Sequence, residues 1–414
     1  MASAETNRQE AAPGTSLEVT VEKLVHGGAG LARHQGRVIL VSYVLPGERV
    51  RVAIRGARAG VLEAQLEELL EASDQRVNPP CPYFGRCGGC QLQHGRYELQ
   101  LEIKRAVLLE TLRRLGGIEL SLEPQIVAGP GWQYRNRVQL HLRAGRIGFF
   151  QAASERLCSI EQCMIASPRI NQALAALRQL LSEAGIPRSV KTLEVFSDEQ
   201  RVQINVRAGA ETRTARRRVA RAMAERLPGL IEDALEYAAA GELYRVGHRS
   251  FFQVNRFLLG DLVSCALEGA EGSSALDLYA GVGLFSLPLA RRFARVTAVE
   301  SSAWAAADLE HNAARAGLAI QVCRQDAAAF LAGQSQAPDF VLADPPRSGL
   351  GREVVRELLR LKPRRLTVVS CEPATLARDL AHLAGGGYRI ERLALVDLFP
   401  QTHHIEAIVS LLRA

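Results

Sequence analysis

The stretch that decides the fold of the C-terminal part is Ala275-Leu276-Asp277-Leu278-Tyr279-Ala280-Gly281-Val282-Gly283. An apolar run that ends at a glycine-containing turn and leads into a helix predicts the first strand–helix unit of a doubly wound α/β sheet. The glycines allow a ligand to approach the backbone of the turn closely. Because Ser286 stands in the place of a third glycine, the stretch lacks the complete fingerprint of a nicotinamide-binding domain.

From this stretch to the end of the chain, apolar runs alternate with helical stretches. We expect strands at residues 275–279, 295–300, 320–324, 339–343, 365–370, 389–397 and 405–411. Helical stretches separate the first five strands and predict right-handed parallel crossovers, whereas a short loop joins the last two and predicts an antiparallel hairpin. The C-terminal part should therefore be a Rossmann-like sheet with one reversed strand.

Acidic side chains follow consecutive strands of this sheet. Glu300 closes the second strand, Asp326 follows the third, and Asp344-Pro345-Pro346-Arg347 follows the fourth. The carboxyl ends of parallel strands meet at one edge, where ligands bind. We expect Glu300 to accept the hydrogen bonds of a ribose diol, Asp326 to face an adenine, and the prolines to hold Asp344 over the pocket. Helix capping is the alternative role for Asp344.

A cysteine and a glutamate complete this edge. Cys371 lies in Ser370-Cys371-Glu372-Pro373, directly after an expected strand, and Glu406 lies near the start of the last strand. A thiolate and a carboxylate can form the nucleophile and base of covalent catalysis. A buried structural cysteine and a surface glutamate are the alternative. The position of both residues on the same edge as the acidic residues favours catalysis.

Three further cysteines lie close together in Cys81-Pro82-Tyr83-Phe84-Gly85-Arg86-Cys87-Gly88-Gly89-Cys90. The two glycines let the backbone curl so that several thiolates point at one centre, and Cys163 or Cys158 can provide a fourth ligand. Four thiolates suit either zinc or an iron–sulfur cluster. The spacing predicts a metal site and does not separate these two metals.

The N-terminal segment 17–70 consists of short alternating stretches with turn signals, which predict a small β-barrel. Its basic residues fit either an oligonucleotide-binding surface or a solvated one; they are Arg33, His34, Arg37, Arg49, Arg51, Arg55 and Arg58. The middle of the chain predicts an α+β region, with a strand at 134–142 and a strand pair at 191–206. We expect Arg135 and Arg137 of the first strand to contact phosphates.

The whole chain has 414 residues, a net charge of +7 and eight cysteines. This length allows two or three domains, and the charge favours a polyanionic partner such as RNA. No apolar run approaches a membrane span, and the polar N-terminus has no signal-peptide core, so we expect a cytoplasmic protein without a membrane partner. In that compartment the cysteines should be ligands, nucleophiles or core residues and not disulfides.

Six motifs together resemble the uracil-5-methyltransferases of RNA, which depend on S-adenosylmethionine. The branch that they resemble acts on ribosomal RNA and places a TRAM barrel before a cysteine cluster. The motifs are Cys81…Cys87-Gly88-Gly89-Cys90…Cys163, Ser250-Phe251-Phe252-Gln253-Val254-Asn255, Asp277-Leu278-Tyr279-Ala280-Gly281-Val282-Gly283, Asp344-Pro345-Pro346-Arg347-Ser348-Gly349, Ser370-Cys371-Glu372-Pro373-Ala374-Thr375-Leu376-Ala377-Arg378-Asp379 and Phe399-Pro400-Gln401-Thr402-His403-His404-Ile405-Glu406.

The resemblance implies a division of the chain and a set of site residues. The division is a disordered tail (1–14), a TRAM β-barrel (15–74), a central α+β domain with the cysteine cluster (75–94 and 125–248) and a methyltransferase domain (95–124 and 249–414). It also implies Cys371 as nucleophile and Glu406 as proton acceptor. The implied cofactor contacts are Gln253, Tyr279, Glu300, Asp326 and Asp344, and the implied ligands of a [4Fe-4S] cluster are Cys81, Cys87, Cys90 and Cys163, with Cys158 as the spare.

The implied reaction is methyl transfer to carbon 5 of a uridine in 23S ribosomal RNA, through a covalent cysteine–uracil adduct, by a monomer. Transfer RNA is the alternative target. Two other functions stay open at this point. One is an amino-group methyltransferase, which would need neither Cys371 nor Glu406, and the other is an RNA-binding protein with a vestigial site.

Two positions depart from the family pattern. Leu284 stands where many relatives have an asparagine that contacts the cofactor, and Glu372 follows Cys371 where asparagine is usual. We therefore assign no cofactor role to Leu284. A carboxylate next to the thiol raises the pKa of the thiol unless it points away or is paired.

Overall fold

The computed structural model describes residues 13–183, 185–208, 212–231 and 233–414. Residues 1–12 of the expected N-terminal tail lie outside this description. The chain divides into two compact units. The first comprises residues 1–107, 150–156 and 400–404, and the second comprises residues 108–149, 157–399 and 405–414.

The first unit contains the expected small barrel, which is closed and has the strand order β1-β2-β3-β5-β4. Its strands are β1 (Ser16–Leu24), β2 (Gly30–His34), β3 (Arg37–Val41), β4 (Arg49–Arg58) and β5 (Val61–Glu71). Alternate valine and isoleucine side chains of these strands are buried and form the barrel core. This alternation places the intervening charged residues outside, because successive side chains of a strand point to opposite faces.

A buried carboxylate fastens the segment that leaves the barrel. Glu48 is fully buried and accepts hydrogen bonds from the Arg76 guanidinium, with one of them 2.7 Å long. It also accepts from the backbone N–H groups of Leu45 at 2.7 Å and Ser73 at 3.3 Å. Burial alone would raise the pKa of Glu48, but these partners outweigh burial and lower it. Helix α1 (Tyr97–Gly116) follows farther along the chain.

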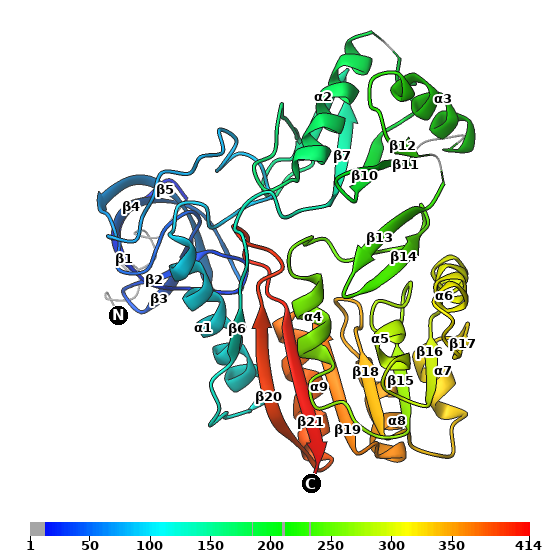
Figure 1. The fold of residues 1–414 in the computed structure, drawn as a ribbon. Coiled ribbons are helices and arrows are strands. Elements are labelled where there is room, and N and C mark those ends of the chain that lie inside the picture. The colour runs from blue at the N-terminus through cyan, green and yellow to red at the C-terminus, as the bar shows by residue number, and fades with distance from the viewer. Residues whose placement is uncertain (1–12, 184, 209–211, 232) are drawn as a thin grey trace. The chain divides into compact units, whose positions relative to one another are not determined.

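The second unit contains the expected Rossmann-like sheet, with the strand order β17-β16-β15-β18-β19-β21-β20-β6 (Figure 1). Its strands are β6 (Gln125–Val127), β15 (Ser274–Leu278), β16 (Arg295–Val299), β17 (Ile320–Cys323), β18 (Phe340–Ala343), β19 (Arg365–Ser370), β20 (Tyr388–Val396) and β21 (Ala407–Arg413). Strands β15 to β19 pair in parallel, and β21 runs antiparallel to both β19 and β20. The predicted strands and the reversed strand are confirmed, whereas β6 was not predicted.

The helices around this sheet are α4 (Leu259–Ala266), α5 (Ser286–Ala290), α6 (Ala303–Arg315), α7 (Ala327–Ala332), α8 (Gly351–Leu361) and α9 (Pro373–Gly385). Helices α4 and α5 share one apolar core with the strands of the sheet, and this core includes Leu262, Leu287, Phe340 and Val369. Leu284 belongs to this core, and its carbonyl oxygen accepts a hydrogen bond of 3.1 Å from the Tyr244 hydroxyl. A packing role therefore explains the leucine at this position.

A six-stranded sheet and a separate hairpin make up the rest of the second unit. The sheet has the order β12-β11-β10-β7-β8-β9, with β7 (Arg137–Arg143), β8 (Arg146–Phe150), β9 (Leu157–Ser159), β10 (Thr192–Ser197), β11 (Val202–Ala208) and β12 (Leu230–Ile231). Helices α2 (Pro168–Ser182) and α3 (Thr212–Ala224) pack against it. The hairpin consists of β13 (Leu235–Ala239) and β14 (Glu242–Val246), so the expected α+β character of this region is confirmed.

Candidate active site

The glycine turn after β15 forms one side of the site. Tyr279 has a left-handed φ of 62°, and Gly281 and Gly283 have φ values of 56° and 95°. The positive φ of Gly283 favours glycine, and a Cβ atom there would also lie 2.9 Å from the Leu287 side chain. Ser286 donates a hydrogen bond to the fully buried Asp277 carboxylate. The serine that stands in the place of a third glycine therefore supplies a hydrogen-bond partner for a buried acid.

Glu300 fixes the same turn from the end of β16. Its Oε2 atom accepts a hydrogen bond of 2.8 Å from the Gly281 N–H, and its Oε1 atom accepts one of 2.6 Å from the Ser302 N–H. Each carboxylate oxygen has a second lone pair that can accept from a ligand. Glu300 thus lies where the sequence predicted it, at the carboxyl edge and against the glycine turn.

The next two carboxylates differ in their surroundings. Asp326 is the N-cap of α7, and its Oδ1 atom accepts from the N–H groups of Ala328 at 2.9 Å and Ala329 at 3.2 Å. Asp344 instead accepts a hydrogen bond of 3.2 Å from the Gln253 side-chain amide. Burial raises the pKa of Asp344 to about 7, although the bond from Gln253 opposes the shift. The capping role considered for Asp344 is therefore found at Asp326.

Gln253 reaches Asp344 because several groups hold the segment that carries it. The Arg137 guanidinium donates a hydrogen bond of 2.8 Å to the Ser250 carbonyl oxygen. The Asn136 amide donates to the Gln253 carbonyl oxygen at 3.3 Å, and the Asn136 N–H donates to the Val254 carbonyl oxygen at 3.0 Å. A loop without regular structure thereby presents one defined amide to the partly buried Asp344 carboxylate.

Cys371 and Glu406 lie at the ends of two adjacent antiparallel strands. The residue before Cys371 is Ser370, the last of β19, and it pairs in register with Ala407, the first of β21. The residues just beyond this pair are Cys371 and Glu406, so the register brings the thiol and the carboxylate to one end of the strand pair. The prediction that both fall on the same sheet edge is confirmed by this pairing.

The electrostatics of this pair disfavour charge on both members. Burial and the Glu406 carboxylate raise the pKa of the Cys371 thiol to about 11, and Asp344 adds to the shift. Burial and Asp344 raise the pKa of Glu406 well above the ordinary value. The Arg347 guanidinium opposes both shifts. No role was predicted for Arg347, although its place in the Asp344-Pro345-Pro346-Arg347 motif could have indicated one.

Glu372 points its carboxylate into the start of the following helix. It is the N-cap of α9 and accepts a hydrogen bond of 3.5 Å from the Ala374 N–H. The glutamate that departs from the family pattern is thus paired with a helix N-terminus, where negative charge is stabilised.

The predicted cysteine ligands fall into different units of the fold. Cys81, Cys87 and Cys90 lie in the first unit, and Cys163 lies in the second. The Gly89 N–H donates a hydrogen bond of 3.5 Å to the Cys87 sulfur, and Cys87 and Cys90 both contribute to the raised pKa of Tyr43, after burial. The Asn171 side chain binds the N–H of Cys163 at 2.8 Å and its carbonyl oxygen at 3.0 Å.

The cysteines of the chain are present as free thiols. None of the eight cysteines forms a disulfide, and Cys158 is buried in β9. Among the residues that the structure describes, no group of three or more His, Cys, Asp or Glu side chains is arranged to hold a metal ion. The chemistry of the four thiols fits a cluster.

The arginines expected to contact phosphates are largely engaged within the protein. Arg137 is buried and forms an ion pair of 2.7 Å with Glu194, so the expectation of a phosphate contact is wrong for this residue. In the barrel, Arg33 pairs with Glu22 and Arg49 pairs with Glu71. Residues 15–74 contain eight acidic and seven basic residues. The barrel therefore carries no excess of positive charge.

In the described part of the chain, no helix combines the length and the apolar character that crossing a membrane requires.

Family profiles match both the N-terminal barrel and the C-terminal part of the chain. The TRAM domain profile matches residues 10–66, and the tRNA (uracil-5-)-methyltransferase profile matches residues 191–414. A solved structure with a similar fold is that of Pyrococcus abyssi tRNA (uracil-54, C5)-methyltransferase in complex with S-adenosyl-L-homocysteine, with a TM-score of 0.76 at 24% identity over 96% of this chain and 100% of that chain. The fold and the edge site define an S-adenosylmethionine-dependent RNA methyltransferase with an N-terminal TRAM barrel.

Relatives of known name cover nearly the whole chain. The 23S rRNA (uracil(1939)-C(5))-methyltransferase RlmD of Chromohalobacter salexigens is 37% identical over 99% of this chain and 91% of its own length. The RlmD of Pseudomonas aeruginosa is 36% identical over 95% of this chain and 93% of its own length. An RNA methyltransferase of Aquifex aeolicus is 34% identical over 95% of this chain and 98% of its own length. The chain belongs to the tRNA (uracil-5-)-methyltransferase family of RNA-modifying enzymes.

Proposed function

We propose that the protein methylates carbon 5 of a specific uridine in 23S ribosomal RNA through a covalent adduct between Cys371 and the uracil ring. The observation that carries this proposal is the pairing of Ser370 with Ala407, which brings Cys371 and Glu406 to one end of two strands. Relatives named for 23S rRNA support the choice of ribosomal RNA over transfer RNA. The alternative target, transfer RNA, differs in substrate and not in chemistry.

The first step joins the enzyme to the base. Carbon 5 of uracil is a poor nucleophile towards a sulfonium methyl group, so it must first gain electron density. The Cys371 thiolate adds to carbon 6, and the electrons of the 5,6 double bond form an enolate with density on carbon 5. Arg347 favours the thiolate that this step requires, because it lowers the pKa that burial and Glu406 raise.

The second and third steps transfer the methyl group and release the product. Carbon 5 takes the methyl group from the sulfonium of S-adenosylmethionine, which leaves as neutral S-adenosylhomocysteine. Glu406 then removes the remaining proton from carbon 5, the double bond re-forms, and the Cys371 thiolate leaves. The raised pKa of Glu406 makes its carboxylate a stronger base for this proton. The target uridine must be unstacked to reach the site, which costs least in a loop.

We assign the cofactor to the edge formed by Gln253, Tyr279, Glu300, Asp326 and Asp344. Glu300 can accept from a ribose diol with the lone pairs that the N–H groups of Gly281 and Ser302 do not use. Asp326 caps α7 through Oδ1 alone, which leaves its second oxygen for the adenine. The Gln253–Asp344 pair supports binding of the positively charged part of the cofactor, since a nearby cation favours the ionised form of a partly buried acid.

We also propose that Cys81, Cys87, Cys90 and Cys163 hold a [4Fe-4S] cluster, with zinc as the alternative metal. The cluster would hold chain segments in place, because methyl transfer from a sulfonium requires no electron. Three thiols within ten residues and the N–H···S bond from Gly89 to Cys87 support this ligand set. The visible absorption of anaerobically purified protein distinguishes iron–sulfur from zinc. Full iron content in Cys163→Ser together with loss in Cys158→Ser would reverse the choice of the fourth ligand.

We keep the four-part division of the chain, a monomeric state and a cytoplasmic location as parts of the proposal. One chain supplies all the proposed site residues, which supports a monomer. Eight cysteines without a disulfide support a reducing compartment. Sedimentation of the purified protein with and without RNA tests the monomeric state.

A trapping experiment tests the proposed chemistry. Glu406→Gln cannot remove the carbon 5 proton, so the methylated adduct should accumulate and survive a denaturing gel when RNA and S-adenosylmethionine are present. Cys371→Ala should form no adduct, and an adduct in that variant would show that the nucleophile is another residue. Mapping of 5-methyluridine in ribosomal and transfer RNA from a deletion strain identifies the target.

A further inference from the structure

Trp304 is an exposed tryptophan with cationic and aromatic neighbours. It lies in the first turn of α6 and leaves 54% of its surface exposed. The guanidinium carbon of Arg249 lies 4.4 Å from the centroid of its ring, and the His248 ring centroid lies 6.4 Å away. An exposed indole with an arginine over it offers both a π-face for a nucleobase and a positive charge for a phosphate.

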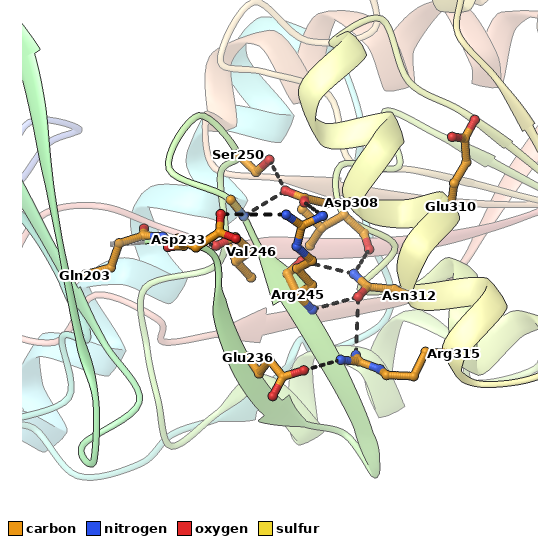
Figure 2. A network of polar contacts seen from close by, with 12 residues as sticks. Gln203, Asp233, Glu236, Arg245, Val246, Ser250, Asp308, Glu310, Asn312 and Arg315 are labelled. Atoms are coloured by element: carbon orange, nitrogen blue, oxygen red, sulfur yellow. Dashed lines mark hydrogen bonds and ion pairs between the residues drawn. The ribbon is translucent and has the colours of Figure 1, made fainter. Parts of the chain in front are cut away.

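The two residues that face Trp304 are the central residues of a tight turn. The Ser250 N–H donates a hydrogen bond of 3.0 Å to the Gly247 carbonyl oxygen and closes this turn around His248 and Arg249. The Oδ2 atom of Asp308 accepts from the Gly247 N–H at 2.7 Å and from the Ser250 hydroxyl at 2.6 Å. Figure 2 shows the bond from Ser250 to Asp308 on α6.

Asp308 therefore clamps both ends of the turn onto the helix that carries Trp304. Residues four positions apart lie on the same face of a helix, so Trp304 and Asp308 are neighbours on α6. Asp308 is buried. A Cβ atom at Gly247 would lie 2.8 Å from its Oδ2 atom, which leaves no room for a side chain at the start of the turn. His248 and Arg249 are thus held beside the indole before any ligand arrives.

The next turn of α6 connects this arrangement to the glycine turn of the active site. Asn312 accepts a hydrogen bond of 2.7 Å from the Arg245 N–H and donates one of 3.1 Å to the Arg245 carbonyl oxygen. It also donates one of 3.0 Å to the carbonyl oxygen of Val282. These contacts, several of which are drawn in Figure 2, fix strand β14 and the glycine turn to one helix.

The residues His248, Arg249 and Trp304 each lie within a few positions, in the sequence, of residues of the proposed site. Phe251, 63% exposed, follows Arg249 by two residues, and Gln253 follows by four. Trp304 follows Glu300 by four residues. A nucleotide that lies on this surface would therefore be close to a base that enters the pocket.

We propose that His248, Arg249 and Trp304 form a nucleotide platform, on which the RNA base next to the target uridine stacks on the indole while Arg249 binds its phosphate. The substrate follows from the proposed function. The occupant is unpaired RNA, because only an unstacked base exposes its π-face to a protein ring. The platform compensates for the stacking that the target uridine and its neighbour lose when the target leaves the RNA strand.

The fluorescence of Trp304 reports directly on this contact. The chain has two tryptophans, so Trp132→Phe leaves Trp304 as the only emitter. A fragment of 23S ribosomal RNA should quench this emission, and S-adenosylhomocysteine alone should not. Trp304→Ala should weaken RNA binding by about 5- to 150-fold, the range for loss of one base–aromatic stack, and Trp304→Phe should restore part of the affinity.

The arginine is tested by salt dependence. Loss of one phosphate contact in Arg249→Ala should reduce the slope of log affinity against log salt by about 0.7. Arg364→Ala is the matched control, because it removes an exposed arginine just before β19, at the sheet edge opposite the site. Each variant should keep the affinity of the wild type for S-adenosylhomocysteine, which also verifies that it is folded.

Two results overturn the platform. One is unchanged RNA affinity in both Trp304→Ala and Arg249→Ala. The other is quenching by S-adenosylhomocysteine together with loss of its affinity in Trp304→Ala, which would place the indole in the cofactor site. RNA binding is measured without the methyl donor, so these readouts judge the platform even if the wild type methylates a different RNA.

Discussion

The rate at which Cys371 is alkylated should show how the protein controls its nucleophile. Burial and the Glu406 carboxylate raise the pKa of this thiol from 9.0 to about 11. This rise in pKa disfavours ionisation of the thiol by about 2.7 kcal/mol. At pH 8, a thiol with this pKa is ionised in only about one molecule in a thousand, whereas an unshifted one is ionised in about one in ten. Free Cys371 should therefore react slowly with iodoacetamide, and its rate should rise about tenfold per pH unit up to pH ~11.

Two substitutions should change this rate in opposite directions. Glu406→Gln removes the charged group that raises the pKa of the thiol most. Burial raises this pKa more than Glu406 does, and burial remains in the variant. The variant should therefore recover less than half of the shift, and alkylation near pH 9 should become faster by up to about tenfold. Arg347→Gln removes the cation that lowers the pKa of the thiol, so alkylation should become slower.

Peptide mass spectrometry after timed alkylation measures each of the eight cysteines separately. Cys265 is the internal control, because burial also raises its pKa but neither Glu406 nor Arg347 contributes to the shift. A wild-type rate that levels off below pH 9, or slower alkylation in Glu406→Gln, would refute the reasoning. Either result would mean that the free protein stabilises the thiolate through a group other than Arg347.

Three other substitutions test separate parts of the fold and site. Asp339 accepts hydrogen bonds from the N–H and hydroxyl groups of Ser273 and Ser274, which lower its pKa to about 2. The lowered pKa stabilises the fold above the unfolded value of 3.8, and this stabilisation is lost as the pH falls through about 2. Asp339→Asn should therefore cost at most about 2 kcal/mol near pH 7 and less than about half of that at pH ~2.5, as thermal unfolding would report. Glu48→Gln leaves the Arg76 cation without its buried partner and should cost about 2–4 kcal/mol, whereas Arg51→Ala, which removes exposed pairs with Glu68 and Glu18, should leave the unfolding temperature nearly unchanged. Glu300→Ala should raise the dissociation constant of S-adenosylmethionine at least about tenfold and leave RNA affinity unchanged; an equal loss of both in calorimetry would assign Glu300 to the fold alone.

The sheet and its edge could be predicted because they follow from continuous apolar runs and from topology. Strands buried on both faces need such runs, and β18 and β19 show them most clearly. Parallel crossovers then force the carboxyl ends to one edge, which is why Glu300, Asp344 and Cys371 could be grouped without coordinates. Strand β6 was missed because it has only three residues, none of them buried.

The details that the sequence did not predict depend on partners far along the chain. Arg137 alternates with apolar residues like a surface arginine, but its carboxylate partner, Glu194, lies 57 positions away. The amide that binds Asp344 comes from Gln253, which lies 91 positions earlier. The capping role of Asp326 is different, because its partners lie two and three residues ahead. The local sequence of that segment could therefore have indicated it.

The segment from Ser250 to Asn255 explains how these distant contacts serve one site. Arg137 and Asn136 hold its carbonyl groups, and Asp308 holds its first side chain. At its other end the Asn255 amide donates a hydrogen bond of 3.1 Å to the Leu398 carbonyl oxygen, in the segment that leads towards Glu406. The six-stranded sheet, helix α6 and the segment after β20 therefore all fix the same short loop. We expect a substitution that removes one of these bonds to displace Gln253 relative to Asp344, so loss of cofactor affinity can originate at residues that do not touch the cofactor.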